Sequence, residues 1–509
     1  MFVLLLILGF LTFVAFRINR VRNYWNSQGI PNIPSIPFVG NFWETFAFRK
    51  SGAEQFEDLY YDEKTKSEPV VGIHCFQKPS LMVKDPELIK RVLIKDFSNF
   101  SDRHVSSDPH SDALGSNNLF MMRNPEWKEM RAKLSPVFTS GKMRHFFNLM
   151  MDVAADLEKC LARQTIQSGT NSFTTEMKEF CALFTTDVIA SCAYGVEAHS
   201  LVDPNSDFRR NGRKVFDFNF RRSIELNSFF LLPEIVSLFK FKLFSKDTSD
   251  FLRSTIQHVM LEREKTRTTR NDLIDVLIAL KNSKRDKEDR ILFQGDVLVA
   301  QAGVFFTAGF ETSSATMSFA LYELAKQPQL QKRLQQEIRQ HAEKHDGKLT
   351  YDNINELEYL TMVIQETLRM YPPLPFLDRI FTPTPDKSTY SMAPYANYSM
   401  PPGMPIFIPI YSIQRDPKFY PDPNTFNPDR FAPENKDNLN QSTYFAFGIG
   451  PHDCIGKRFG LMQAKIGLIS ILKRYTVEFT PDTPKTMKLE KKALILQAKG
   501  GIHLTVKCE

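Results

Sequence analysis

A single cysteine in a glycine-rich turn constrains this chain more than any other feature of its sequence. Residues 447–456 read FGIGPHDCIG, and residues 457–468 have the pattern of a helix. The turn sets Cys454 at a helix N-terminus, where backbone N–H groups and the helix dipole favour a thiolate. The surrounding glycines let the backbone turn tightly and let a flat ligand approach closely. These properties suit a thiolate ligand to a large planar cofactor, although a lone free cysteine is more often a small buried hydrophobe.

The composition places the chain among globular proteins with a reduced interior. Of the 509 residues, 42% are hydrophobic and 44 are phenylalanine, which provides for a large core and apolar cavities. The formal net charge of +7 is modest for this length, and no Lys/Arg tract indicates binding of nucleic acid. The six cysteines are scattered, with no C-x-x-C pair, so we expect a cytosolic body without disulfides.

The N-terminus is interpreted as a retained membrane anchor. Residues 1–16 carry no charged side chain, and three arginines follow within residues 17–22. A cleavable signal peptide would carry positive charge before the apolar run and a small-residue cleavage site after it, and this chain has neither. The positive-inside rule then predicts a lumenal N-terminus and a cytosolic body. We therefore expect an anchor at residues 1–22 and one large domain at residues 23–509.

Local patterns in the body predict mostly helix with a small β-rich portion. Residues 70–76 and 81–83 have the pattern of a hairpin, and residues 85–87 (Asp-Pro-Glu) have the N-cap and first turn of a helix. Amphipathic helical patterns dominate from 145 to 280. Near the C-terminus, residues 494–496 and 502–506 flank a Lys-Gly-Gly turn and predict a second hairpin.

Two segments of the helical region need separate interpretation. Residues 229–244 are rich in aromatic and aliphatic side chains, and residues 239–244 alternate basic with apolar side chains, as segments at a membrane surface do. The same residues also fit a half-buried core helix. Residues 281–290 form a charge run, which predicts a solvated loop.

A long apolar helix is predicted near the middle of the chain. Between residues 297 and 322 the only charged side chain is Glu311, within AGFETS at 308–313. The segment has too many polar residues and glycines for a second membrane span, so we expect it to cross a helical core. A buried carboxylate is costly unless it is paired, hydrated or protonated, and a mid-helix glycine costs about 1 kcal/mol relative to alanine. Because both unfavourable features occur within the same short segment, we expect the segment to be functional. The alternative is that it forms a polar patch that faces a neighbouring loop.

Several motifs, in this order, resemble the signatures of the cytochrome P-450 superfamily, the haem-thiolate monooxygenases. The resemblance is carried by E-x-x-R at 366–369, P-x-R-F at 428–431 and F-G-x-G-x-H-x-C-x-G at 447–456. W-x-x-x-R at 127–131 and the AGFETS segment also fall where that family has them. The resemblance extends over essentially the whole chain and is greatest to the insect microsomal, xenobiotic-metabolising branch.

The resemblance implies a mainly α-helical, haem-binding catalytic domain with a small β-rich portion, preceded by the membrane anchor helix. Cys454 would be the proximal thiolate on the iron of haem b, with Phe447 and Gly448 at the ring. Four further side chains would meet the haem propionates: Trp127, Arg131, Arg379 and His452. His452 departs from the family's usual arginine and lacks its bidentate fork. A buried network would hold the scaffold of the cysteine loop: Glu366, Arg369 and Arg430.

The resemblance also implies the reaction. One atom of O₂ would be inserted into a lipophilic substrate, with electrons from an NADPH-dependent flavoprotein reductase in the endoplasmic reticulum membrane and a small haem electron carrier as a second donor. Gly309 would let the central helix widen, and Glu311 and Thr312 would relay protons. Three basic residues would face the reductase: Lys457, Arg458 and Lys465. The candidates for the substrate pocket are Leu119, Phe120, Phe305, Ala308, Leu374, Phe376 and Leu496.

Two other functions use the same cysteine. A haem-thiolate isomerase or dehydratase would rearrange peroxides without O₂, but the presence of Thr312 beside Glu311 argues against it. A non-catalytic haem protein that carries a hydrophobic ligand would form no product with a reductase and NADPH.

Overall fold

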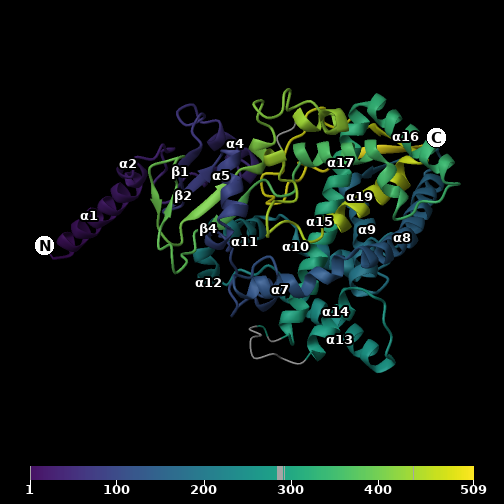
Figure 1. Ribbon diagram of the computed structural model, residues 1–509, viewed down its shortest axis with the longest axis horizontal. Coiled ribbons are helices and arrows are strands. Elements are labelled where there is room, and N and C mark those ends of the chain that lie inside the picture. The colour runs from purple at the N-terminus through teal and green to yellow at the C-terminus, as the bar shows by residue number, and fades with distance from the viewer. Residues whose placement is uncertain (1, 284–290, 292, 439–440) are drawn as a thin grey trace.

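One helix projects from the rest of the molecule in the computed structural model, which describes residues 2–283, 291, 293–438 and 441–509 (Figure 1). This helix, α1 (Phe2–Arg22), contains an 18-residue window with a mean hydropathy of 2.2 and has no buried residue. Its length and composition suffice to cross a membrane. The chain then enters the body at α2 (Tyr24–Ser27), where the buried Trp25 donates a hydrogen bond from its indole Nε1 to the Ile73 carbonyl, 2.9 Å away.

A four-stranded sheet lies next to α1, in the order β1-β2-β7-β4 (Figure 1). Its strands are β1 (Val70–Cys75), β2 (Lys78–Val83), β4 (Leu377–Ile380) and β7 (Pro405–Ile408). The predicted first hairpin is confirmed, because β1 and β2 pair antiparallel with Val70 opposite Val83. The predicted helix start after it is also confirmed: Asp85 caps α5 (Pro86–Lys90) by accepting the Leu88 N–H at 2.9 Å.

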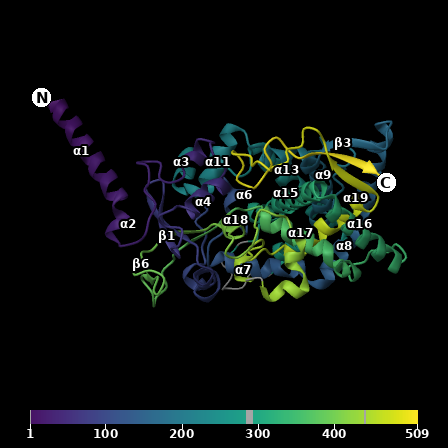
Figure 2. The same ribbon diagram turned by 90° about the horizontal axis from the view of Figure 1, so that it is seen from above.

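The larger part of the body is helical and is built around α15 (Asp296–Lys326), the predicted central helix (Figures 1 and 2). Twenty-three of its residues are buried, because α9, α19, α17 and α13 pack around it. The other long helices are α4 (Gly52–Tyr60), α7 (Glu126–Leu134), α8 (Ser140–Gln167), α9 (Met177–Ile189), α10 (Asp207–Val215), α11 (Phe220–Leu231), α13 (Lys246–Thr266), α14 (Leu273–Asn282), α16 (Pro328–Lys344), α17 (Glu358–Met370) and α19 (Lys457–Leu472).

Short helical segments connect these elements. The α-helical ones are α3 (Trp43–Phe46), α6 (Ala113–Ser116), α12 (Val236–Phe239) and α18 (Ile410–Ile413). Two π-helical turns are η1 (Arg91–Lys95) and η4 (Ala190–Tyr194). The 3₁₀-helical turns are η2 (Phe97–Asn99), η3 (Ser135–Phe138), η5 (Pro233–Ile235), η6 (Asn353–Glu356), η7 (Pro428–Phe431), η8 (Pro433–Asn438) and η9 (Gln441–Thr443).

The predicted C-terminal hairpin is wrong. Strand β9 (His503–Cys508) lies between β3 (Ser172–Glu176) and β8 (Tyr475–Phe479), and it pairs antiparallel with both. Residues 494–496 instead run into the core, where the Leu496 N–H donates to the Pro373 carbonyl at 2.9 Å. Gly500 and Gly501 have the expected positive φ angles, so the predicted turn is confirmed. The predicted pairing partner of the strand that follows the turn, β9, is wrong. A two-stranded ribbon, β5 (Tyr390–Ser391) with β6 (Ser399–Met400), completes the sheets of the described residues.

The helix alternative for residues 239–244 is also wrong, since α12 ends at Phe239 and the chain continues as bends to Phe244. Leu238 and Phe239 are 74% and 60% exposed, whereas Phe244 is fully buried. Of the charged segment 281–290, residues 284–290 lie outside the described residues.

Candidate functional site

The backbone of the cysteine loop depends on two glycines. Gly448 and Gly450 have φ angles of +70° and +76°, which side chains with a Cβ rarely adopt. A Cβ on Gly450 would also lie 2.2 Å from the Leu93 carbonyl oxygen. The loop closes through the Cys454 N–H, which donates to the Phe447 carbonyl at 2.8 Å, and α19 starts three residues later. The sequence therefore folds Cys454 into a rigid turn at the start of a buried helix.

The Cys454 thiol is accessible in this turn, although the loop around it excludes most water. Desolvation raises the pKa of the thiol, and the Gly456 N–H, Arg131 and Lys457 lower it by less. A coordinating metal ion would deprotonate the sulfur outright.

Three arginines and His452 gather beside the cysteine loop. Arg103 and Arg379 are desolvated, and burial together with Arg103 lowers the pKa of Arg379 to about 9. The Nε atoms of both have no hydrogen-bond partner among the described residues. Arg131, on α7, donates to the Asp453 carbonyl at 2.9 Å and to its carboxylate at 2.7 Å. Buried guanidinium groups with free donors form a binding site for anionic groups.

His452 is a neutral, buried part of this cluster. Its ring lies 3.7 Å from the Trp127 ring, centroid to centroid, and its Nε2 donates to the Ser101 carbonyl at 2.7 Å. Burial, followed by Arg103 and Arg379, lowers the pKa of His452 to about 2. Its Nδ1 is buried without a partner in the described part of the chain. The side chain can therefore contribute a neutral hydrogen-bonding atom here, but not the charge of an arginine.

The central helix places Glu311 and Thr312 in different surroundings. Thr312 is half-buried, and its hydroxyl donates to the Ala308 carbonyl at 2.8 Å. The Glu311 carboxylate is fully buried and is paired: Lys178 of α9 lies at 2.8 Å, and the Gln497 amide donates to it at 2.6 Å. The cost of burying this carboxylate is thus met by partners that no local pattern revealed.

Gly309 has a packing role that differs from the expected widening. Helix α15 is continuous from Asp296 to Lys326. A Cβ at Gly309 would lie 2.6 Å from the Ile189 Cδ1 at the end of α9. The glycine therefore lets α9 approach α15 closely.

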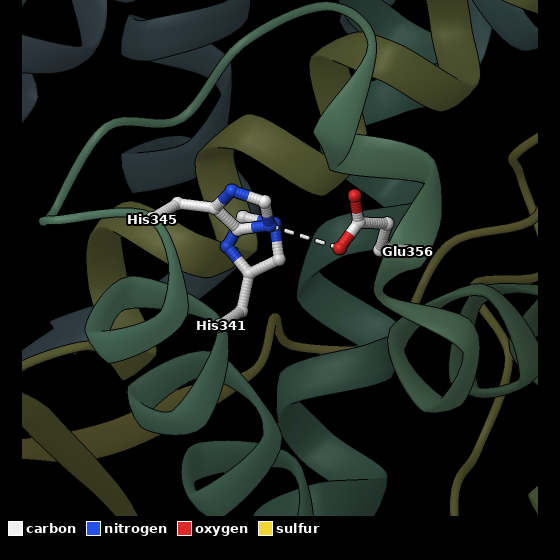
Figure 3. Close-up of side chains that lie close together, drawn as sticks. All are labelled: His341, His345 and Glu356. Carbon is white, nitrogen blue, oxygen red and sulfur yellow. Dashed lines mark hydrogen bonds and ion pairs between the residues drawn. The ribbon is translucent and has the colours of Figure 1, made fainter.

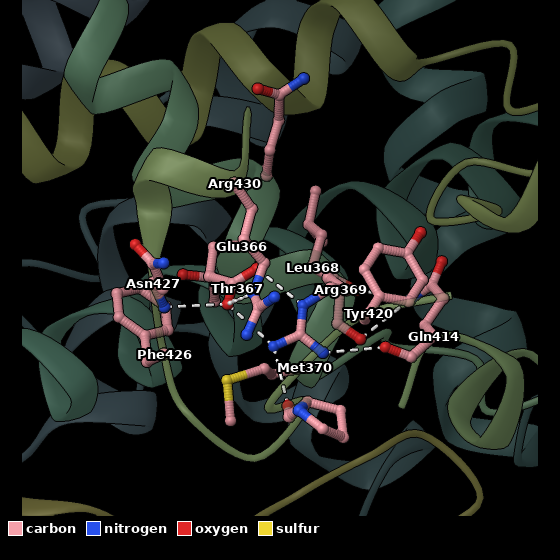
Figure 4. Close-up of polar contacts among 12 residues, drawn as sticks. Glu366, Thr367, Leu368, Arg369, Met370, Gln414, Tyr420, Phe426, Asn427 and Arg430 are labelled. Atoms are coloured by element: carbon pink, nitrogen blue, oxygen red, sulfur yellow. Dashed lines mark hydrogen bonds and ion pairs between the residues drawn. The ribbon is translucent and has the colours of Figure 1, made fainter. Parts of the chain in front are cut away.

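The predicted network of Glu366, Arg369 and Arg430 is assembled and buried (Figure 4). Arg369 forms a bidentate pair with Glu366, with bonds of 2.7 and 2.8 Å, and neither side chain is exposed. Arg430 reaches Glu366 at 3.3 Å. Gln414 extends the network, because its amide donates to the Arg369 carbonyl and its oxygen accepts the Phe445 N–H at 2.7 Å. Helix α17 is thereby tied to the chain two residues before Phe447.

The predicted pocket residues do not form one group. Phe120 and Phe376 both lie 6.0 Å from the Phe230 ring, in an aromatic cluster of the core. Phe305 stacks on Phe138 at 5.5 Å, and Ala308 is exposed on the same helix as Thr312. The others are buried or half-buried: Leu119, Leu374 and Leu496. A separate cavity of about 190 Å³ lies beside α1, and no predicted pocket residue lines it.

Lys465 is not part of an exposed docking face, which corrects one expectation. The residue is 6% exposed within α19, and its ammonium donates to the Ile354 carbonyl at 3.3 Å. Lys457 and Arg458 are exposed at the start of the same helix. The side chain of Lys465 lies on the inner face of α19, which the residue type alone does not reveal.

Replacing Lys465 with methionine is expected to stabilise the protein at neutral pH by about 1–2 kcal/mol. Burial lowers the pKa of Lys465 from 10.5 to about 8, so the charged form is destabilised in the folded state. The gain should decline between about pH 8 and pH 10.5, where the folded side chain is already neutral and the unfolded one is still charged. Urea unfolding of Lys465→Met and of the exposed control Lys457→Met measures this. A gain that is the same at every pH would contradict the explanation.

Five residues that complete the site were not predicted from the sequence: Arg103, Gln414, Lys178, Gln497 and Asp453. Arg103 and Gln414 lie in irregular segments, so neither residue has a periodic pattern around it. The aromatic–basic spacing of Trp127 and Arg131 was the one local signal, and both side chains do contact the cysteine loop.

This arrangement agrees with the comparisons with known proteins. The cytochrome P450 family model matches residues 31–506, and the chain belongs to that family. Its class is therefore that of the haem-thiolate monooxygenases, which confirms the predicted fold class and haem cofactor.

Similar curated proteins come from insects. "Probable cytochrome P450 6g2" of Drosophila melanogaster is 48% identical over 92% of this chain and 91% of the relative. "Probable cytochrome P450 6w1" of the same species is 41% identical, over 89% and 87%. "Cytochrome P450 6k1" of Blattella germanica is 40% identical, over 92% and 89%. The predicted insect branch is thereby confirmed.

Proposed function

We propose that this chain is a membrane-anchored monooxygenase that inserts one atom of O₂ into lipophilic small molecules, with Cys454 as the proximal ligand of haem b. The observation that carries the proposal is the position of the exposed Cys454 next to three buried or half-buried arginines, two of which have an Nε donor without a partner among the described residues. Haem b needs both, since it has an iron to be ligated and two propionates to be neutralised.

The residues around Cys454 fit the cofactor. Arg103, Arg131 and Arg379 would bind the propionates, with Trp127 and His452 packed beside them. Phe447 and Gly448 would lie at the ring, where the glycine leaves room. The Cys454 thiolate would donate electron density to the haem iron, which favours cleavage of the O–O bond. The network of Glu366, Arg369 and Arg430 would keep the loop in the geometry for ligation.

Thr312 and Glu311 would move the protons that oxygen reduction consumes. The Thr312 hydroxyl lies on the half-buried face of α15 with Ala308, which suits delivery of a proton into the site. Glu311 would supply that proton after a shift of its side chain away from Lys178, since its carboxylate is held on the α9 side in this structure.

The substrate is proposed to be neutral and lipophilic, and either a foreign compound such as an insecticide or an endogenous hormone or lipid. Most predicted pocket residues are aromatic or aliphatic, and pockets of this composition bind apolar ligands. The membrane is the natural source of such compounds, and residues 1–22 would anchor the catalytic domain, residues 23–509, to the cytosolic face of the endoplasmic reticulum.

An NADPH-dependent flavoprotein reductase is the proposed electron donor, and Lys457 is proposed to face it. Charge reversal in Lys457→Glu is expected to slow association with the reductase about 10-fold at low ionic strength, because basic side chains near the site steer an acidic partner. Stopped-flow reduction at increasing salt measures this, and the difference from wild type should shrink as charges are screened. A salt-independent difference would indicate damage to the fold near Cys454.

Reconstitution separates this function from its alternatives. The purified protein, reductase, NADPH and a panel of lipophilic compounds are expected to give products heavier by one oxygen atom in mass spectrometry. The oxygen should derive from ¹⁸O₂. Turnover of hydroperoxides without reductase, and no product with it, would favour the isomerase.

A further inference from the structure

His341, His345 and Glu356 converge where α16 ends and η6 begins (Figure 3). His341 lies in the last turn of α16, and His345 is the residue that directly follows the helix. Their rings lie 4.6 Å apart between centroids. Glu356 ends η6 after a short connection. One ligand atom from each residue lies within 4.8 Å of the others. None of the three side chains has a role in the proposed haem chemistry.

Each of the three side chains already has a polar partner at this point of the structure. His345 Nε2 lies 2.9 Å from a Glu356 oxygen, and Lys344 Nζ lies 2.8 Å from the same oxygen. His341 is 9% exposed and its Nε2 contacts the Asn353 carbonyl at 3.0 Å.

We propose that His341, His345 and Glu356 bind a divalent transition-metal ion of the zinc type. Two imidazoles and one carboxylate are the ligands that Zn²⁺ prefers, and Mg²⁺ or Ca²⁺ would select oxygen ligands instead. The fourth position falls to water or to the Asn353 carbonyl. Around zinc, ligand atoms lie about 3.3 Å apart, so the present arrangement must contract. His345 and Glu356 can provide this movement, because their side chains are 24% and 41% exposed.

Binding the ion requires small rearrangements. His341 must carry its proton on Nδ1, and its Nε2 then turns from the Asn353 carbonyl to the metal. Lys344 competes with the ion for the Glu356 carboxylate. The ion would join α16 to the segment 351–356. That segment contacts α19 after the cysteine loop: Arg458 donates to the Tyr351 hydroxyl, and Lys465 donates to the Ile354 carbonyl.

Calorimetric titration of the haem-loaded, full-length protein with ZnCl₂ tests the proposal. The protein is prepared without a polyhistidine tag and treated with a chelator first. We expect a saturable site in wild type and binding at least about 10-fold weaker in His345→Gln, since even outer partners of a metal contribute about 10–100-fold. Lys344→Met is expected to bind zinc about 2- to 5-fold more tightly, because the competing surface ion pair is removed.

The controls distinguish specific zinc binding by the three ligands from non-specific binding to surface histidines. His199→Gln removes an exposed histidine that lies 3.3 Å from Glu197 without a second imidazole, and zinc affinity should be unchanged. MgCl₂ should give no saturable heat. Circular dichroism and the ferrous–CO spectrum verify that each variant is folded. Equal zinc affinity in wild type and His345→Gln, or no saturable binding in wild type, would overturn the proposal.

Discussion

Replacing Arg369 with leucine is expected to destabilise the protein by about 3–5 kcal/mol and to remove most of the haem-loaded form. The change leaves the fully buried Glu366 carboxylate without its bidentate partner, and the single contact from the Arg430 Nε, at 3.3 Å, does not replace the two lost bonds. The carbonyl of Gln414 also loses its donor, and Gln414 holds the Phe445 N–H near the cysteine loop. Absorbance of the haem per mole of purified protein and the urea midpoint measure the effect.

Two variants show whether the buried geometry is responsible. Arg369→Lys should not restore haem content, because an ammonium cannot form the bidentate pair. Asp429→Asn removes the partner of Arg333 in an exposed ion pair of the neighbouring η7, and should change stability by at most about 1 kcal/mol. Normal haem content in Arg369→Leu would show that the loop does not depend on this network.

The variant Glu311→Gln is expected to lower product formation about 100-fold while leaving the haem spectrum and the protein yield nearly unchanged. Glutamine keeps the shape of the side chain but cannot carry the proton. Its carbonyl oxygen still accepts a hydrogen bond from Lys178, so the packing between α9 and α15 is preserved. Rates of product formation and of NADPH consumption, measured together, separate a proton-delivery defect from a defect in electron transfer.

Glu323→Gln is the matched control for this prediction. Glu323 is another buried carboxylate on α15, it accepts a hydrogen bond from Tyr371 at 2.5 Å, and it lies three helical turns beyond Glu311. Its variant should retain near-normal turnover. Equal losses in both variants would mean that α15 needs its buried charges for structure, and that Glu311 has no separate part in proton delivery.

Local sequence signals predicted the elements whose formation depends on neighbouring residues. The cap at Asp85, the hairpin of residues 70–83 and the long apolar helix all follow from patterns within a few turns of chain. The C-terminal hairpin failed for the opposite reason. Residues 503–508 find partners in β3, more than 300 residues earlier in the chain, and in β8, and such pairings leave no mark on the local pattern.

The site could be predicted only in part, because a sequence motif identifies a functional residue but does not show which distant residues contact it. Glu366 and Arg369 form the expected pair since they lie on one face of α17, as their spacing requires. Arg103, Gln414 and Lys178 come from other elements, and only the packing of those elements brings them to the site. Lys465 was predicted to be exposed because it lies near the cysteine motif. It is buried instead, because its position on α19 points its side chain towards the core.

The wavelength of the ferrous–CO absorption band, measured for wild type and Cys454→Ala, tests the central claim most directly. A thiolate trans to CO gives a strongly red-shifted band, because the sulfur donates electron density to the iron. Wild type should show this band. Cys454→Ala should lose it together with product formation, whereas the half-buried control Cys508→Ala, on β9, should keep both. A red-shifted band that persists in Cys454→Ala would contradict the assignment of the cysteine loop as the haem site.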